Sequence, residues 1–449
     1  MEDHLSNRRP TGMRGFTIVW LGQLVSLFGT SMTQFALTIW AWQITGQATA
    51  LALVAFFSFG PTVVLSPVAG ALVDRWNRKL VMMLSDLAAG LSTTAILLLY
   101  ATDRLQIWHL YVAGAFTGAF QAFQFPAYSA AISMMLPKEH FTRASGMLSL
   151  AESASGIFAP VLAAALLGLI GITGVMTIDL LTFLAAIGGL LLVHIPQPEL
   201  TEAGKEGRGS LLKESFYGFR YIFARPSLLG LQLVFFAINF TASFGYTVLA
   251  PMVLARTGND ELALGSVQSA GAVGGVAGGL LLSVWGGPKR RVHGVLAGMA
   301  LAAILGELPM GFGRALPVWA TASFFGAFMI PIINGSNQAI WQAKVAPDVQ
   351  GRVFATRRLI AQITAPAAII LAGPLADRVF EPAMAPGGSL AGILGDVFGT
   401  GPGAGMAVMF VLAGILGAMV GLVAYSVRVI RDAEGIVPDH DSAAVAAAV

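Results

Sequence analysis

Long apolar runs separated by short polar segments dominate the pattern of this 449-residue chain. A helix needs about 20 apolar residues to cross the roughly 30 Å hydrocarbon core of a bilayer. The runs are continuous rather than alternating, so they favour membrane helices over the strands of a β-barrel. We therefore predict an all-α integral membrane protein with twelve transmembrane helices, at residues 16–43, 49–73, 80–101, 107–135, 144–170, 172–195, 227–255, 262–285, 294–313, 316–343, 358–380 and 404–428.

The composition supports this prediction. Apolar residues make up 56% of the chain and charged residues only 11%, less than half of the roughly 25% typical of soluble domains. Small residues let membrane helices approach one another closely, so the 53 glycines indicate tight helix packing more than flexible loops.

The distribution of cations gives the orientation. Lys and Arg collect on the cytoplasmic side of membrane proteins. With twelve spans, all but four of the 26 Lys and Arg fall on the side of the two termini, the exceptions being Arg104, Arg256, Arg314 and Arg378. We expect a multi-pass protein of the plasma (cytoplasmic) membrane with both termini in the cytoplasm. This bias accounts for the net charge of +3 without a nucleic-acid partner.

Several chemistries find no support in the sequence. The chain has no cysteine, which excludes disulfides, thiolate metal sites and thiol catalysis. It contains no phosphate-binding GxxxxGK[ST] motif, no HExxH and no GxSxG. The six histidines have no metal-ligand spacing. We therefore expect a protein that is not an enzyme, does not hydrolyse ATP and needs no cofactor or metal.

One polar stretch divides the chain into two halves of six spans. Residues 196–226 form a linker that becomes amphipathic from Ser210, as in a helix lying on the anionic inner leaflet. The other predicted parts are a cytoplasmic tail at 1–15, six-helix bundles at 16–195 and 227–430, and a disordered cytoplasmic tail at 431–449.

The halves resemble each other in sequence. A Thr-Gly pair opens the second run of each half, and the motif GAF recurs in the fourth. A parallel duplication of this kind is the layout of a transporter with a central site between its halves. The matched positions are Thr45, Gly46, Gly70, Trp76 and 118–120 in the first half, and Thr257, Gly258, Gly279, Trp285 and 326–328 in the second.

The decapeptide GALVDRWNRK at residues 70–79 resembles the loop signature of the major facilitator superfamily, G-x3-D-[RK]-x-G-[RK]-[RK]. Asn77 replaces the usual Gly, a mild change because Asn tolerates left-handed backbone. The resemblance implies two pseudo-symmetric six-helix bundles, the major facilitator fold. The matching residues are Gly70, Asp74, Arg75, Arg78 and Lys79.

Longer stretches narrow the resemblance to the macrolide-efflux-like drug:proton antiporters. They are residues 24–42, 72–90, 285–296 and 373–390. The resemblance implies export of amphipathic compounds driven by proton entry. The chain departs from the family in three ways: the helix-5 motif is degraded around Pro160, residues 107–135 contain no Lys or Arg, and Ser283 stands where the first half has Asp74.

Four acids lie within the predicted spans, where a charge costs at least ~2.5–3.5 kcal/mol and so needs a partner or a function. Glu152 is the leading candidate for proton coupling, against a structural pair with an arginine. Asp86, Glu307 and Asp179 are further coupling candidates. For Asp86 we favour neutralisation of Arg75, Arg143 or a neighbour, and for Asp179 we favour capping or water contact at the outer rim.

The resemblance also implies an ionic latch that holds the helix ends together in one state of the transport cycle. Asp74 is the strongest latch candidate, because the positive-inside rule does not explain an acid in a cytoplasmic loop. Arg78 and Lys79 are open to a purely topological role. The latch residues are Gly70, Asp74, Arg75, Arg78 and Lys79, with Arg352, Arg357 and Arg358 as counterparts from the other half.

Helices 1, 4, 7 and 10 line the central site in this superfamily, so their polar and aromatic residues are candidates for a substrate cavity. An apolar cavity with a few amides suits amphipathic cargo. Each residue is equally open to a role as an interhelical hydrogen bond. The cavity candidates are Gln34, Gln121, Gln124, Tyr128, Asn239, Asn334, Asn337 and Trp341, with Gln23 among further amides nearby.

The sequence thus predicts a monomeric exporter that works by alternating access in the lipid bilayer and exchanges protons for an amphipathic small molecule. Two alternatives keep the fold and change the cargo, to a self-made siderophore or peptide metabolite, or to a lysophospholipid. A non-transporting receptor would be free to lose the latch charges, yet Asp74 and Arg75 are intact. A membrane enzyme would need a convergent catalytic constellation, and none is visible.

Overall fold

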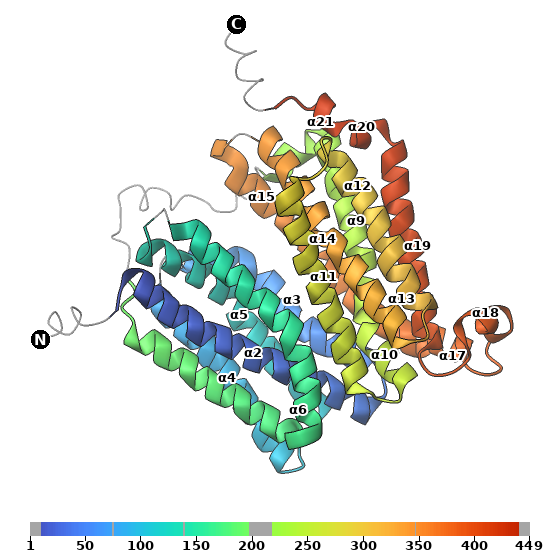
Figure 1. The fold of residues 1–449 in the computed structure, drawn as a ribbon, viewed down its shortest axis with the longest axis horizontal. Coiled ribbons are helices and arrows are strands. Elements are labelled where there is room, and N and C mark those ends of the chain that lie inside the picture. Colours follow the sequence, from blue (N-terminus) through green and yellow to red (C-terminus); the bar gives the residue numbers. More distant parts are fainter. Residues whose placement is uncertain (1–9, 74–75, 138–139, 197–217, 346, 440–449) are drawn as a thin grey trace, which may run out of the picture. The chain divides into compact units, whose positions relative to one another are not determined.

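The architecture is helical throughout the part of the chain that the structure describes (Figure 1). The computed structural model describes residues 10–73, 76–137, 140–196, 218–345 and 347–439. By its internal contacts the chain divides into two compact units, Met1–Leu200 with Asn259–Ser269 and Thr201–Gly258 with Ala270–Val449.

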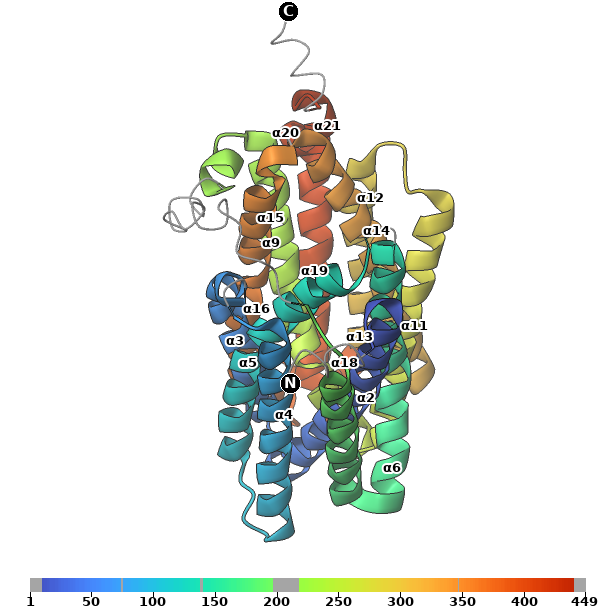
Figure 2. The ribbon, with the colours of Figure 1, turned by 90° about the vertical axis from the view of Figure 1, so that its left-hand side faces the viewer.

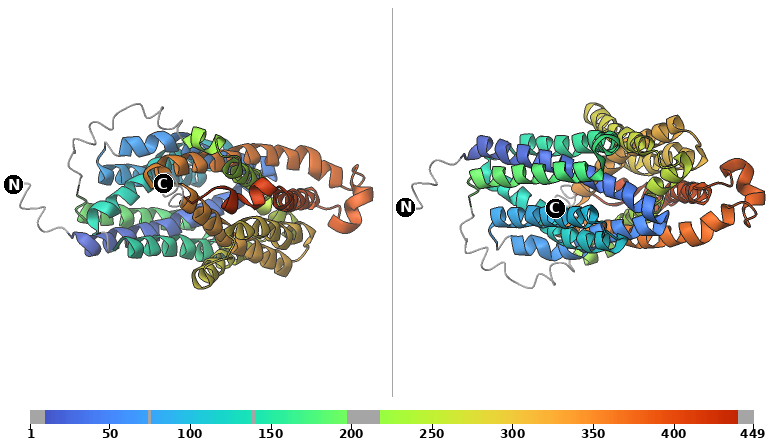
Figure 3. Two further views of the ribbon diagram at one scale, coloured as in Figure 1. Left: turned by 90° about the horizontal axis from the view of Figure 1, so that it is seen from above. Right: turned by 90° about the horizontal axis from the view of Figure 1, so that it is seen from below.

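The first unit contains five helical segments that run alongside one another (Figures 1 and 3). The last of them, α6, is interrupted at Gly171, where φ is 66°. Only glycine adopts this backbone region without strain, so Gly171 ends one span and starts the next. The segments are α2 (Gly12–Thr45), α3 (Ala48–Val73), α4 (Arg78–Ala101), α5 (Ile107–Met135) and α6 (Phe141–Leu192).

The second unit is built around α19, which packs against both α9 and α12 (Figures 1 and 2). Two short π-helices, η2 and η3, interrupt its long helices. Its elements are α9 (Pro226–Thr247), α10 (Leu249–Thr257), α11 (Glu261–Trp285, of which residues 270–285 belong to this unit), α12 (Arg291–Ala302), η2 (Ala303–Glu307), α13 (Leu308–Phe312), α14 (Leu316–Lys344), α15 (Pro347–Gln362), α16 (Thr364–Leu375), η3 (Ala376–Phe380), α17 (Glu381–Met384), α18 (Ala391–Phe398), α19 (Ala404–Ser426), α20 (Arg428–Arg431) and α21 (Ala433–Ile436).

The helices coincide with the predicted spans. Ten helical segments among the described residues are long and apolar enough to cross a membrane. One of them, Met147–Leu192, contains the break at Gly171 and so covers the greater part of two predicted spans. The predicted span 107–135 coincides with the 29-residue helix α5. The prediction of an all-α membrane protein is therefore confirmed.

Glycines create the close contacts between helices, as their abundance suggested. A Cβ atom at Gly118 of α5 would collide with the carbonyl oxygen of Ser58 in α3. In the second unit, Cβ atoms at Gly274 and Gly278 of α11 would collide with the carbonyl oxygens of Phe324 and Phe328 in α14. These helix pairs touch through their backbones, which is how membrane helices gain packing energy in an apolar solvent.

Asn77 replaces the usual Gly without using left-handed backbone: its φ is −65°, and its side chain caps α4 by accepting a hydrogen bond from the Leu80 N–H. One local prediction was wrong: the segment after residue 431 is not disordered throughout, because α21 forms at Ala433–Ile436. Most of the predicted interfacial helix, which begins at Ser210, lies outside the described residues.

The glycine contacts predict opposite effects for two neighbouring substitutions in α11. Gly278→Ala should lower the free energy of unfolding by about 1–3 kcal/mol, because the obstructing Phe328 oxygen is backbone and cannot rotate away. Gly275→Ala, which meets no atom within 4 Å, should be neutral or stabilise the helix by up to about 1 kcal/mol. Thermal unfolding of the purified variants in detergent measures both effects. Equal unfolding midpoints for the two variants would contradict the proposed α11–α14 contact.

Candidate functional site

A buried carboxylate joins three helices of the first unit. Asp86 lies two turns into α4 and is 5% exposed. The Gln23 amide of α2 donates to its Oδ2 over 2.7 Å, and the Gln124 amide of α5 donates to its Oδ1 over 2.6 Å. The Gln124 amide also lies 3.3 Å from the Gln23 Oε1 atom. We call Gln23, Asp86 and Gln124 the amide–carboxylate cluster.

The two donors satisfy the Asp86 carboxylate without neutralising it. A buried ionised group is costly unless it is both hydrogen-bonded and paired. Each oxygen of Asp86 receives a hydrogen bond, and both donors, from Gln23 and Gln124, are neutral amides. Uptake of a proton would remove the buried charge, so this arrangement suits a group that alternates between ionised and neutral forms.

Tyr128 adds an unsatisfied hydroxyl to the same helix face. It follows Gln124 by four residues in α5, a spacing that brings side chains onto one face. Its buried hydroxyl oxygen has no hydrogen-bond partner among the described residues. Buried polar atoms are nearly always paired, and a hydroxyl can both donate and accept. Tyr128 therefore offers a free donor and acceptor one helical turn from the amide–carboxylate cluster.

The other three acids have different surroundings. Asp179 of α6 is buried and accepts hydrogen bonds from the hydroxyls of Thr30 (3.2 Å) and Thr93 (3.0 Å), which join three helices. Glu152 of α6 is exposed. Glu307 ends the π-helix η2, and its buried Oε2 atom has no partner in the described part of the chain. Asp86 is thus the acid whose partners are themselves polar candidates of the sequence analysis.

Some cavity candidates are exposed side chains, and others make hydrogen bonds to the protein itself. Gln34, Gln121 and Asn334 are exposed. Asn337 and Trp341 of α14 are buried and bonded to each other, since the indole N–H donates to the Asn337 Oδ1 over 3.0 Å. The Asn239 amide of α9 lies 3.4 Å from the Ala361 carbonyl oxygen of α15.

Two of the basic latch candidates, Lys79 and Arg357, make contacts inside their own units. Lys79 donates to the Val193 carbonyl oxygen over 2.7 Å, which ties the start of α4 to the end of α6. Arg357 donates to the Gln338 Oε1 over 2.8 Å, and its guanidinium lies 5.4 Å from the Trp341 ring centroid. Arg78 is buried and Arg358 is exposed.

The remaining latch candidates are described only in part. Gly70 lies in α3 and Arg352 in α15, but the structure describes neither residue's surroundings. Asp74 and Arg75 lie outside the described residues. The latch accordingly stays a prediction from the sequence.

Sequence reasoning identified the members of the amide–carboxylate cluster but not their association. It treated the two glutamines as cavity residues and expected Arg75, Arg143 or a neighbour as the partner of Asp86, but the side chains of Arg75 and Arg143 lie outside the described part of the structure, so that expectation stays a prediction. Asp86, Gln23 and Gln124 lie on three different helices, so their contacts form only when those helices pack together. A search for acids and amides at similar positions within neighbouring spans would have suggested these residues as candidates, but not which of them pair.

Comparison with known proteins identifies relatives across most of the chain. The family model described as Major Facilitator Superfamily matches residues 19–368. Macrolide efflux protein A of Streptococcus pyogenes is 26% identical over 370 residues, which cover 81% of this chain and 90% of that protein. Multidrug efflux pump Tap of Mycolicibacterium fortuitum is 27% identical over 382 residues, which cover 80% and 88% of the two chains.

Solved structures share the fold at low sequence identity. A bacterial homologue of the human lysosomal transporter Spinster superposes with a TM-score of 0.67 at 16% identity, over 92% of this chain and 98% of that one. A bacterial homologue of the iron transporter ferroportin superposes with a TM-score of 0.64 at 15% identity, over 92% and 99%. The transporter fold is therefore established, and the relatives are transporters rather than enzymes.

The cluster geometry predicts unequal effects for two substitutions in α5. Gln124→Leu should lower the free energy of unfolding by about 1–3 kcal/mol, because it leaves a buried oxygen of Asp86 without its donor. Tyr128→Phe should have little effect, because it removes a hydroxyl that makes no hydrogen bond among the described residues. Thermal unfolding in detergent compares the two. A loss in Tyr128→Phe as large as in Gln124→Leu would show that the hydroxyl has a partner.

Proposed function

The chain belongs to the Major Facilitator Superfamily of membrane transporters, and from this premise we propose that it exports amphipathic small molecules across the plasma membrane in exchange for protons. The names of the relatives, macrolide efflux protein and multidrug efflux pump, support export of such compounds. Their 26–27% identity to this chain supports a cargo of the same general class and does not identify the individual compound.

The buried carboxylate of Asp86 is the observation that carries the proton-coupling part of the proposal. It is fixed between α2 and α5 by neutral donors, so its protonation state controls how three helices are joined. An ionised carboxylate only accepts hydrogen bonds, whereas a protonated one must also donate. We propose as acceptors the Oε1 atom of Gln23 or Gln124, or the hydroxyl of Tyr128, which has no partner among the described residues.

Proton binding would drive transport only if it favours one state of the helices over another. A protonated Asp86 must donate a hydrogen bond. This requires the side-chain amide of Gln23 or Gln124 to rotate so that its oxygen faces Asp86, or a new contact between Asp86 and Tyr128. Either change alters the hydrogen bonds that link α2, α4 and α5. The cluster thereby converts a change of charge into a change of helix packing, which is the differential free energy that a proton-driven exporter requires.

The amides suit cargo with both apolar and polar parts. Exposed Gln34 and Gln121 in the first unit, and exposed Asn334 in the second, stand on helices that are otherwise mainly apolar. In each unit, such helices offer apolar contact and a few hydrogen-bonding groups of the kind that orient a ligand. A siderophore, a peptide metabolite and a lysophospholipid are the other cargoes that the assay below should include.

The first prediction from this proposal concerns coupling. In liposomes with an imposed pH gradient, the parent protein should move a fluorescent amphipathic dye uphill, and the movement should collapse with the gradient. Asp86→Asn should abolish uphill movement, because an amide cannot bind and release the proton, yet retain downhill exchange of the dye. Unfolding in detergent checks that the variant stays folded.

Glu152→Gln is the matched control, because Glu152 is an exposed acid of the same unit. It should leave the gradient-driven rate near that of the parent. Loss of coupling in Glu152→Gln but not in Asp86→Asn would overturn the assignment and make Glu152 the proton site. Loss in Glu307→Gln alone would transfer the role to the second unit.

A second prediction concerns the ionic latch, which we propose acts through Asp74. Asp74→Asn should abolish both uphill and downhill transport, because the alternation of states depends on the latch, while expression and membrane insertion stay normal. Transport assays beside a fluorescence-detected size-exclusion profile make the comparison. Full transport by a well-folded Asp74→Asn protein would remove Asp74 from the mechanism.

A further inference from the structure

The second copy of the loop signature lacks the acid that the first copy has. Ser283 stands at the position of Asp74, and its hydroxyl donates to the Gly279 carbonyl oxygen of its own helix over 2.9 Å. Lys289, Arg290 and Arg291 follow within eight residues without an intervening acid. This loop therefore carries a concentrated positive charge that its own sequence does not balance.

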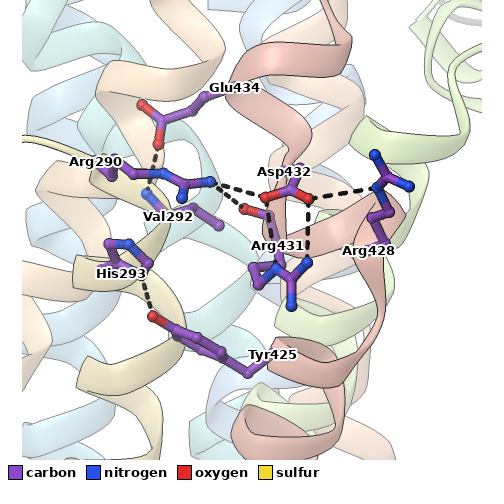
Figure 4. Close-up of polar contacts among 8 residues, drawn as sticks. All are labelled: Arg290, Val292, His293, Tyr425, Arg428, Arg431, Asp432 and Glu434. Carbon is purple, nitrogen blue, oxygen red and sulfur yellow. Dashed lines mark hydrogen bonds and ion pairs between the residues drawn. The ribbon is translucent and has the colours of Figure 1, made fainter.

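The missing acid comes from the end of the chain, 142 residues away (Figure 4). Asp432, directly after α20, accepts a hydrogen bond from the Arg290 Nη2 atom over 2.9 Å. The same nitrogen lies 3.4 Å from the Arg431 carbonyl oxygen. Hydrogen bonds from Arg431 and then Arg290 lower the pKa of the Asp432 carboxyl, so Asp432 stays ionised at neutral pH.

A second acid of this segment caps the next helix. The N-cap residue of α12, Arg290, provides no side-chain acceptor for the first N–H groups of that helix. The Glu434 Oε2 accepts from the Val292 N–H over 2.9 Å and so fills this role from a distant part of the chain (Figure 4). Buried Lys344 of α14 donates to the Glu434 carbonyl oxygen (2.6 Å) and to the Asp439 Oδ1 (2.7 Å).

Apolar and ring contacts pack the end of α19, α20 and α21 against the rest of the second unit. Ala433 is fully buried and belongs to the core cluster of the second unit. A Cβ at Gly230 of α9 would lie 2.7 Å from the Ile430 Cγ1 atom, so α20 packs closely on α9. The rings of Tyr425 and His293 stack with centroids 5.4 Å apart, and the tyrosine hydroxyl is hydrogen-bonded to the His293 ring nitrogen (Figure 4).

We propose that residues 432–439, which we call the tail clasp, are a positioning element of the transport cycle. Asp432 and Glu434 supply to the second loop the negative charge that Asp74 supplies to the first. The tail clasp thereby restores the charge balance between the two copies and fixes the start of α12. This inference rests on the proposed transport function and assigns a role to residues outside the loop signature itself.

The experiment first measures docking of the tail clasp. The chain contains no cysteine, so spin labels can be attached at Ser283→Cys and Gly435→Cys without further substitutions. Both positions are exposed, and Gly435 meets no atom within 4 Å. Distance measurements in nanodiscs should give one narrow distribution for the parent. Asp432→Asn with Glu434→Gln should broaden and lengthen it, whereas Arg428→Gln should not, because Arg428 is 86% exposed and 3.8 Å from Asp432.

The second measurement follows the cycle without depending on any cargo. A cysteine at exposed Gln121 reports opening through its labelling rate with a membrane-impermeant maleimide applied to one side of proteoliposomes. Release of the tail clasp should change this rate by about fivefold or more, the lower end of typical coupling between sites. A charge-exchange variant carries Arg290→Asp together with Asp432→Arg and leaves Glu434 unchanged. It should restore both docking and the labelling rate.

The outcomes separate this inference from the proposed function. Unchanged labelling with a released tail clasp would overturn the inference, as would a changed rate with the tail clasp still docked. Failure of charge exchange to restore labelling, in a protein whose tail clasp has docked again, would also overturn it. If the parent protein moves no dye, the proposed cargo or driving ion is rejected. If release of the tail clasp still changes the labelling rate in that case, the positioning role is supported.

Discussion

Every backbone N–H and C=O group that a chain carries into the apolar interior of a membrane must find its partner within the protein, and the rest of the structure depends on that constraint. Helices satisfy the backbone, so the described part of the chain is helical. Side chains satisfy the remainder at defined points. Arg256, at the end of α10, illustrates this by donating to the carbonyl oxygens of Gly403, Gly313 and Phe398 over 3.2, 2.8 and 2.8 Å.

The same requirement explains which buried acid is suited to change its hydrogen bonds. Asp179 is held by two threonine hydroxyls, and Glu381 accepts from the backbone N–H groups of Gly403 and Met406. The threonine hydroxyls at Asp179 can donate or accept, but the backbone N–H groups at Glu381 only donate and so fix one ionised arrangement of that acid. Asp86 instead has two amides that can each present either a donor or an acceptor, and Tyr128, whose hydroxyl has no partner among the described residues, lies on the same helix as one of them. A site that accepts two arrangements at small cost is the physical basis for a switch.

The two units solve related problems with different residues. The start of α4 is capped from within its own loop by Asn77, whereas the start of α12 is capped by Glu434 from the end of the chain. Close glycine contacts recur in both units, between α3 and α5 and between α11 and α14. Backbone packing is therefore common to both units, while the placement of charge has diverged between them.

The sequence alone determined the membrane spans, the segregation of cations, the repeat and the family, because each depends on runs of neighbouring residues or on short motifs. It also identified Asp86, Gln23 and Gln124 as chemically important, but not as partners. Their contacts, and that of Arg290 with Asp432, join residues 38 to 142 positions apart. Which faces of distant helices meet depends on side-chain packing across the whole unit, so only the tertiary structure decided these pairings.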